Sequence, residues 1–213
     1  MSRANAGTKG VPRADREAQI VRAAAEIFGA EGFGGTSVAV VAERAGISKP
    51  LIYQYFGSKE GLFSACVHEA GQVLGDEIER IAGLGAVGLQ RALNTLDGMF
   101  RLLEPQPWVW HILYDPTAPR EGQIADEITG YTDRMQRLAE EGVAEMMRAA
   151  GNDDPLDAAA LTAAWLRIVD ALVTWWADHP DVSPAEMSAR CVRIFAAVVG
   201  AELPAGADVA VRA

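Results

Sequence analysis

The spacing of apolar residues constrains the fold most strongly, because it follows the period of an α-helix along almost the whole chain. Stripes at three- and four-residue spacing recur, beginning with Ile20, Ala24, Ile27 and Phe28, and runs that alternate every second residue are absent. Clusters of glycine and proline divide the chain into segments of helical length. The chain is therefore predicted to be all-α, with about nine helices and no internal repeat.

The predicted helices are separated by these breaks and are capped by hydroxyl side chains near the N-terminus. Thr36, Ser48 and Ser58 each precede a predicted helix and are the expected N-caps, because a hydroxyl oxygen accepts an unpaired backbone N–H. The expected ranges are 13–30, 37–45, 49–56, 58–82, 86–103, 108–114, 121–150, 156–177 and 184–201.

Two short helices joined by a tight turn lie between residues 36 and 63. The first has an apolar inner face that includes Val38, Val41 and Ala42, and Gly46 ends it. Two such helices are typical of a helix-turn-helix. The second helix leaves an outward face whose candidates are Ser48, Lys49, Leu51, Tyr53, Gln54 and Tyr55. These side chains suit a DNA major groove, where lysine and glutamine bind base edges and tyrosine hydroxyls reach phosphates.

Residues 13–65 resemble the N-terminal signature of the TetR (tetracycline-repressor) family. The resemblance rests on Thr36-Ser37-Val38, Ala45-Gly46-Ile47-Ser48, Ile52-Tyr53, Tyr55-Phe56 and Ser58-Lys59-Glu60-Gly61-Leu62, with Gly32-Phe33 before them. It implies an N-terminal three-helix helix-turn-helix domain and a C-terminal helical ligand-binding and dimerisation domain. The expected divisions are a basic arm over 1–12, the DNA-binding domain over 13–57, the effector-binding and dimerisation domain over 58–203 and a tail over 204–213.

The resemblance also implies individual roles in binding a double-stranded DNA operator. The recognition helix corresponds to Lys49 through Tyr55. The side chains expected to face bases are Lys49, Leu51, Gln54 and Tyr55, and those expected to hold phosphates are Tyr53, Lys59, Thr36 and Ser37. In one departure, Ala39 and Val40 stand where such proteins often carry charged residues.

The charge of the chain is distributed unevenly. The formal net charge is −10, but residues 1–60 hold eight lysines and arginines against six acids, which leaves +2 there and −12 in the remainder. A mildly basic head on an acidic body is compatible with DNA binding and favours head-first approach. Arg3, Lys9 and Arg13 either add contacts along the DNA backbone or in a minor groove, or form a solvated tail.

The last two predicted helices are apolar nearly all round. Trp165, Ile168 and Leu172 mark one face of the helix at 156–177, and Leu166 and Val169 mark another. A helix pair that is apolar on two sides needs a second partner. The simplest partner is the same pair in another subunit, which predicts a homodimer with an isologous four-helix interface. Burial in the core of a single subunit is the alternative.

The family resemblance implies a small-molecule effector held by the central helices of the body. Trp110, His111 and Tyr114 form one aromatic face and are candidate effector-binding residues. Trp165, Arg167 and Asp170 are further candidates, although Arg167 and Asp170 equally suit an ion pair at the dimer interface. We expect an apolar or aromatic effector that releases a repressor from a palindromic operator. A repressor without an effector is the alternative.

Enzyme chemistry finds little support in the sequence. The three histidines and two cysteines lack metal-binding spacing, and no phosphate-binding glycine loop or Gly-x-Ser-x-Gly elbow occurs. No catalytic residue, metal or cofactor is therefore expected. The first twelve residues hold no apolar stretch, and no run approaches the roughly 18 apolar residues of a membrane helix. A cytoplasmic protein that binds no membrane is the expectation.

Overall fold

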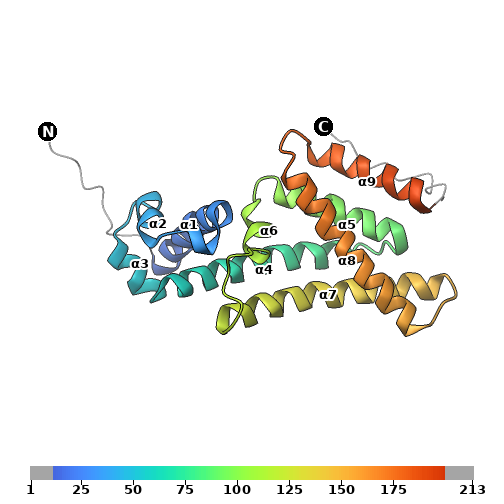
Figure 1. The fold of residues 1–213 in the computed structure, drawn as a ribbon, viewed down its shortest axis with the longest axis horizontal. Coiled ribbons are helices and arrows are strands. Elements are labelled where there is room, and N and C mark those ends of the chain that lie inside the picture. The colour runs from blue at the N-terminus through green and yellow to red at the C-terminus, as the bar shows by residue number, and fades with distance from the viewer. Residues whose placement is uncertain (1–11, 200–213) are drawn as a thin grey trace. The chain divides into compact units, whose positions relative to one another are not determined.

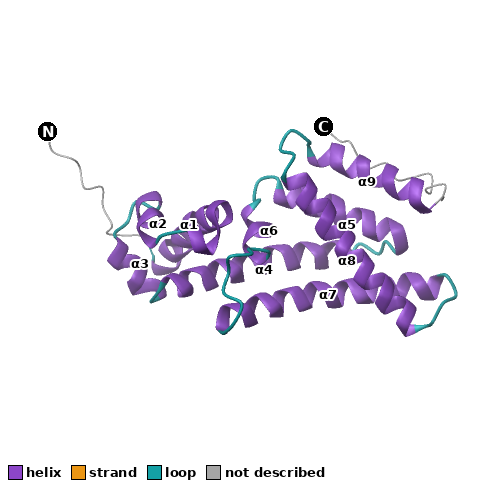
Figure 2. Cartoon of the chain, in the orientation of Figure 1, coloured by secondary structure: helices purple, strands orange, loops and turns teal. Residues whose placement is uncertain are grey.

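The computed structural model describes residues 12–199, and this range holds nine α-helices and no strand (Figures 1 and 2). The all-α prediction is confirmed. The helices are α1 (Arg13–Gly35), α2 (Val38–Arg44), α3 (Lys49–Phe56), α4 (Lys59–Ala82), α5 (Gly88–Leu103), α6 (Trp108–Leu113), α7 (Gln123–Ala149), α8 (Pro155–Ala177) and α9 (Pro184–Val199). The predicted C-terminal tail, and the predicted arm apart from Pro12, lie outside the described residues.

The predicted helix bounds are close to the observed ones except at the end of α1. We expected this helix to end near Ala30, but it continues to Gly35 across a break at Gly32, whose φ is +70° and ψ 168°. Glycine adopts this conformation without the steric cost that a Cβ imposes. The helical pattern therefore resumes for one short turn beyond the glycine.

One of the three predicted helix caps, Thr36, is wrong, because its hydroxyl bonds to Gly32 and not to the start of α2. Ser37, not Thr36, is the N-cap of α2, and its side chain accepts a bond from the Val40 N–H at 3.3 Å. Thr36 is buried and its hydroxyl donates back to the Gly32 carbonyl at 2.8 Å. Ser58 does cap α4, accepting from the Gly61 N–H at 3.0 Å. Ser48 occupies the N-cap position of α3 but makes no side-chain cap bond.

The chain forms two compact units. Unit 1 comprises residues 1–70 and 108–128, and unit 2 comprises residues 71–107 and 129–213. Helices α4 and α7 each contain residues of both units, whereas α6 belongs entirely to unit 1. Within unit 1, α6 packs along α1. The predicted domain boundary at residue 57 stays a prediction.

Unit 1 has an aromatic core between α1 and the start of α4. Phe28 and Phe63 are fully buried and meet edge to face, with ring centroids 4.9 Å apart. Phe33 lies 5.0 Å from Phe63. Burying one such ring contributes roughly 1.5–3 kcal/mol, so this cluster is a main anchor of the head. Gly29 lets α6 approach α1, because a Cβ there would lie 2.6 Å from the Trp108 Cβ.

Unit 2 is held together mainly by contacts between α5 and α9. Leu96 and Phe100 of α5 are fully buried, and Phe100 meets Trp176 of α8 edge to face at 5.2 Å. Within unit 2, α4 and α7 approach closely at Gly71 and Gly75, where a Cβ would collide with Tyr131 and Arg134 respectively. Among the described residues, no helix is long and apolar enough to cross a membrane.

Candidate nucleic-acid interface

The predicted helix-turn-helix is present in α2 and α3. Gly46 forms the turn between them with a φ of +65°, and the Ile47 N–H donates to the Ala42 carbonyl at 3.0 Å. A residue with a Cβ is strained in this left-handed conformation, which explains glycine at the turn. Val41 of α2 and Ile52 of α3 are fully buried. The two helices are thus fixed by their inner faces, which leaves the outer face of α3 uncovered.

The outer face of α3 carries most of the predicted DNA-contacting residues. Lys49, Tyr53 and Gln54 are exposed, as is Ser48 just before the helix. Leu51 and Tyr55 are half-buried. The structure therefore brings the polar candidates together on one surface, with the two less polar candidates at its margin.

Three basic side chains of the head lie over aromatic rings. The distance from the charged group to the ring centroid is 5.8 Å for Lys49 and Tyr53, 4.4 Å for Lys59 and Phe33, and 5.1 Å for Arg13 and Tyr55. A cation at these distances is attracted by the negative face of the ring. None of the three cations forms an ion pair within residues 12–199, so their positive charges are not compensated by bound carboxylates.

The contact of Phe33 with Lys59 was not predicted from the sequence, which grouped Arg13 with the basic arm. Arg13 is the first residue of α1, and its guanidinium lies beside the end of the recognition helix through Tyr55. No local pattern announces this contact, because it joins helices that are separated along the chain. Thr36 is buried with its hydroxyl bonded to Gly32, so of the predicted Thr36 and Ser37 pair only Ser37 offers an exposed hydroxyl.

The effector candidates on α6 form a compact aromatic pair within unit 1. The rings of Trp110 and Tyr114 stack with centroids 4.0 Å apart and planes 25° apart. Trp110 is buried, Tyr114 is 44% exposed and His111 is exposed. Their spacing of four residues places Trp110 and Tyr114 on one face of the segment, as predicted, whereas His111 does not join the stack.

The effector candidates on α8 lie in unit 2 and do not form one cluster. Trp165 is half-buried and lies 5.9 Å from the ring of Phe195 on α9. Arg167 is exposed and Asp170 half-buried. Within the described part of the subunit they form no ion pair with each other. Arg167 thus remains available at the surface of α8.

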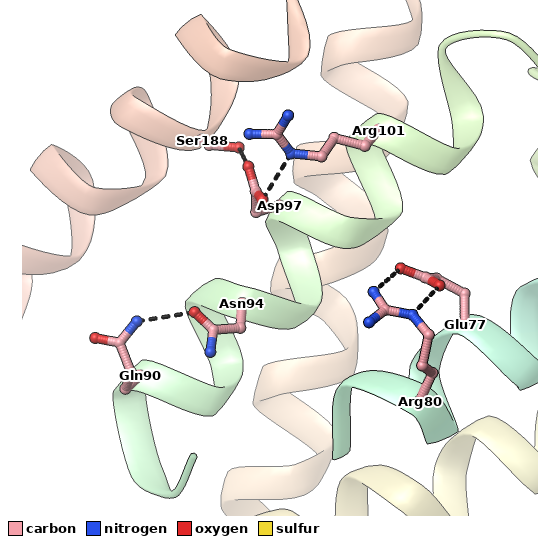
Figure 3. Close-up of polar contacts among 7 residues, drawn as sticks. All are labelled: Glu77, Arg80, Gln90, Asn94, Asp97, Arg101 and Ser188. Carbon is pink, nitrogen blue, oxygen red and sulfur yellow. Dashed lines mark hydrogen bonds and ion pairs between the residues drawn. The ribbon is translucent and has the colours of Figure 1, made fainter. Parts of the chain in front are cut away.

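In unit 2, several arginine side chains form ion pairs with acidic side chains (Figure 3). Arg101 Nε donates to Asp97 at 2.8 Å, and the buried hydroxyl of Ser188 donates to the other oxygen of that carboxylate at 2.7 Å. Arg80 donates to both oxygens of Glu77 at 2.8 and 2.7 Å. The Asp97 carboxylate therefore joins α5 to α9.

The strongest charge cluster of unit 2 centres on Arg134 of α7. Its guanidinium donates to Glu79 at 2.8 Å and to Asp76 at 3.0 Å, both on α4. The hydrogen bond from Arg134 lowers the pKa of the Glu79 carboxyl, and the two carboxylates raise the pKa of Arg134. Each guanidinium in these pairs is neutralised locally by acids.

The surface of α8 and α9 is apolar in a way that the surface of the head is not. Ile168 and Trp175 of α8 are 39% and 43% exposed, and Ile194 and Val198 of α9 are 46% and 79% exposed. These four residues are referred to below as the α8–α9 apolar face. Large apolar side chains exposed on two helices of one unit suit contact with another protein chain. In the described part of the chain, no group of three or more histidine, cysteine or acidic side chains is placed to hold a metal ion.

Comparisons with known proteins agree with this geometry. Residues 20–66 match the family profile described as bacterial regulatory proteins, tetR family. The HTH-type transcriptional activator FasR of Mycolicibacterium smegmatis is 26% identical over 123 residues, covering 58% of this chain and 56% of that protein. The HTH-type transcriptional repressor BdcR of Escherichia coli is 43% identical over 60 residues, covering 28% of this chain and 30% of that protein. The chain thus matches about half or less of the length of these curated relatives.

Solved structures extend the likeness over the rest of the chain. A TetR-like transcriptional regulator from Rhodococcus sp. RHA1 has a TM-score of 0.64 at 27% identity, covering 88% of this chain and 99% of that one. AibR in complex with isovaleryl coenzyme A and operator DNA has a TM-score of 0.70 at 19% identity, covering 84% and 97%. FadR from Bacillus subtilis in complex with stearoyl-CoA has a TM-score of 0.68 at 18% identity, covering 85% and 97%. The match at residues 20–66 identifies the helix-turn-helix region as a tetR-family domain, and the likeness to the Rhodococcus regulator extends over most of the rest of the chain.

Proposed function

We propose that the protein is a homodimeric, ligand-responsive transcriptional repressor that binds a near-palindromic operator through the outer face of α3. The observation that carries the proposal is the exposure of Lys49, Tyr53 and Gln54 on a helix that fully buries Ile52 on its inner face. A helix fixed by its inner face and polar on its outer face suits insertion into a major groove.

The roles proposed for individual residues follow their exposure. Lys49 and Gln54 donate to base edges, and Leu51 and Tyr55 contact bases from the margin of the same surface. Tyr53, Ser37 and Lys59 bind phosphates, which position the head without reading sequence. Thr36 is left out of this set, because its buried hydroxyl is already bonded to Gly32.

The homodimer is supported by the α8–α9 apolar face. Ile168, Trp175, Ile194 and Val198 expose apolar surface on the last two helices, and the same patch on a second copy is complementary to it under two-fold symmetry. Two heads related by that axis bind half-sites about one helical turn or somewhat more apart. Affinity then depends on both heads binding together.

The proposed effector presents an apolar or aromatic group to the protein, and acyl-CoA thioesters, whose acyl chain is apolar, are the first class to test. Two of the similar structures are complexes with acyl-CoA, although their identity to this chain supports the fold alone. The stacked Trp110 of α6 and Tyr114, which directly follows that helix, are the proposed aromatic contacts. Helices α4 and α7 each continue from one unit into the other, so an effector-dependent shift in one unit has two continuous helices along which to reach the other.

The DNA-binding proposal is tested by selecting binding sites for the full-length protein from a random DNA library. We expect a near-palindromic site, and Gln54→Ala is expected to relax preference at one symmetric pair of positions by about 1–3 kcal/mol. Selection of no site, or unchanged base preference in Gln54→Ala, would contradict the proposed surface.

The effector proposal is tested by adding acyl-CoA thioesters and free fatty acids to the protein bound to its selected operator. Release of DNA with a change in tryptophan fluorescence is expected, and Tyr114→Ala is expected to bind operator normally but to respond poorly. If Tyr114→Ala responds as the wild type does and Trp165→Phe does not, the α8 candidates form the site instead. A lack of any response across a broader small-molecule library would favour a repressor without an effector.

A further inference from the structure

The loop that follows α6 holds the turn at the end of α1 through two hydrogen bonds, and two more bonds within the loop connect Thr117 to Asp115. Asp115 accepts the Phe33 backbone N–H on Oδ2 at 2.5 Å. Its other oxygen, Oδ1, accepts from both the backbone N–H and the hydroxyl of Thr117 at 2.7 Å. The Thr117 hydroxyl in turn accepts the Gly34 N–H at 2.9 Å. Two consecutive backbone donors of the head are therefore satisfied by side chains 82 and 83 residues further along the chain.

The glycines of this turn make room for the grip. A Cβ on Gly32 would lie 2.7 Å from the Thr117 hydroxyl oxygen and 3.2 Å from Asp115 Oδ1, and the residue also has a φ of +70°. A Cβ on Gly34 would lie 3.3 Å from the Thr117 Cβ. A side chain at Gly32 would therefore push the loop away and strain the backbone as well. Asp115 and Thr117 together are called the loop clamp below.

Phe33, the residue held by the loop clamp, also contacts Lys59, the lysine predicted to bind a DNA phosphate. The Phe33 ring packs 5.0 Å from Phe63, and its face supports the Lys59 ammonium at 4.4 Å. The backbone N–H of the same Phe33 is the group that Asp115 holds. A continuous chain of contacts thus runs from the loop after α6, through Phe33, to Lys59 at the start of α4.

We propose that Asp115 and Thr117 are positioning residues for DNA binding, which fix Phe33 so that its ring presents the Lys59 ammonium to a DNA phosphate. The inference rests on the proposed function, in which Lys59 binds phosphate. A lysine side chain held over a ring loses less conformational freedom when it binds than a free one does. Charge alone predicts the opposite role for Asp115, because an acid near the DNA-binding surface repels DNA.

The first test is therefore whether removing this acid weakens or strengthens DNA binding. The full-length protein is titrated with a random-sequence duplex, which reports phosphate binding without needing the operator. Asp115→Asn keeps one acceptor oxygen but cannot accept on both sides, and it is expected to bind about 3–5-fold more weakly. Glu121→Gln removes an exposed acid of the same loop and is expected to bind equally or slightly more tightly. An Asp115→Asn protein that behaves like Glu121→Gln would overturn the proposal.

A double-mutant cycle with Lys59 separates positioning from general stability. In a Lys59→Ala background, Asp115→Asn is expected to cause no further loss of affinity and no further decrease in the salt dependence of binding. Independent, additive losses would mean that the clamp does not act through Lys59. If Lys59→Ala itself leaves DNA affinity and salt dependence unchanged, the phosphate role of Lys59 fails, and that failure is distinguishable from failure of the clamp.

Thermal melting of each variant checks that it is folded. A pair of milder substitutions at Thr117 tests the loop clamp without changing Asp115. Thr117→Ser keeps the hydroxyl that accepts the Gly34 N–H, whereas Thr117→Val keeps the shape and removes that acceptor. We expect Thr117→Ser to bind DNA as the wild type does and Thr117→Val to bind about 2–3-fold more weakly, the scale of a modest hydrogen bond. Equal affinities for the two variants would count against the clamp.

Discussion

The head in unit 1 and the helices of unit 2 treat their positive charges differently. Lys49, Lys59 and Arg13 of the head lie over aromatic rings, whereas Arg80, Arg91, Arg101 and Arg134 of unit 2 are paired with carboxylates. Arg44 of the head pairs with Glu26, and Arg167 of unit 2 is exposed without an ion pair in the described part of the subunit. A ring orients a cation without neutralising it, so Lys49, Lys59 and Arg13 keep their charge for a polyanion, whereas the paired arginines of unit 2 bind acids within the subunit.

The two regions also differ in the polarity of their exposed side chains. The outer face of α3 is polar, with Lys49 and Gln54 exposed, whereas Ile194 and Val198 are exposed on α9. Polar, uncompensated surface suits DNA, and apolar surface suits a second protein chain. Net charge is therefore a poor guide here, because a chain of net charge −10 still places three cations without ion pairs in the head.

The largest expected effect comes from placing a charge on the α8–α9 apolar face. Trp175→Glu or Ile194→Glu is expected to yield monomers and to lower operator affinity by about 100-fold or more, because the two heads no longer bind together. Leu84→Glu, at a position 64% exposed in the loop after α4, is the control and is expected to stay dimeric. Light scattering and operator titration measure both properties. A monomeric wild type at micromolar concentration would remove the basis of this prediction.

Neutralising one cation in each region tests the charge comparison directly. Lys59→Gln is expected to weaken binding to all DNA sequences by about 10-fold and to reduce the salt dependence by roughly one unit of slope for each bound head. Arg80→Gln removes the same charge from a guanidinium that Glu77 already neutralises, and it is expected to leave the slope unchanged. If both variants change the slope equally, cations over rings and cations in ion pairs do not differ in their contribution to DNA binding.

Removing one ring tests whether aromatic contacts orient the cations. Tyr55→Leu is expected to weaken DNA binding by about 2–5-fold, the scale of an exposed cation–aromatic contact, whereas Tyr55→Phe keeps the ring under Arg13. In an Arg13→Ala protein, Tyr55→Leu is then expected to have no further effect on random-sequence DNA. A further loss confined to operator DNA would instead assign Tyr55 to base contact alone.

The smallest expected effect concerns acid pH and the ion pairs of unit 2. Because Arg134 lowers the pKa of Glu79 in the folded state, their contact stabilises the fold above the unfolded carboxyl pKa and loses that contribution as pH falls through the folded value. Arg134→Gln is expected to lower the melting temperature slightly at pH 7 and progressively less as the pH falls through the folded pKa of Glu79. Lys49→Gln removes a cation that forms no ion pair in the described residues, and it is expected to shift the melting temperature equally at each pH. Calorimetry of the two variants at each pH makes the comparison.

Local features of the fold were predictable because they depend on neighbours along the chain. The start of α9 at Pro184 and the end of α4 at Ala82 were predicted correctly from helical periodicity and breakers. The Ser58 cap was also predicted correctly, since its acceptor and donor lie three residues apart. The Thr36 cap was wrong because two adjacent hydroxyls compete for one position, and burial of Thr36 against Gly32 decided between them.

The sequence by itself determined an all-α chain with a helix-turn-helix, because periodicity, Gly46 at the turn and the residues around α3 are read over short distances. Only the tertiary structure decided that α6 packs on α1 and that Asp115 holds Phe33, 82 residues away. It also decided which cations rest on rings and which pair with acids, as for Lys59 on Phe33. Such contacts join segments far apart in the chain, and their geometry arises only when packed helices bring those segments together.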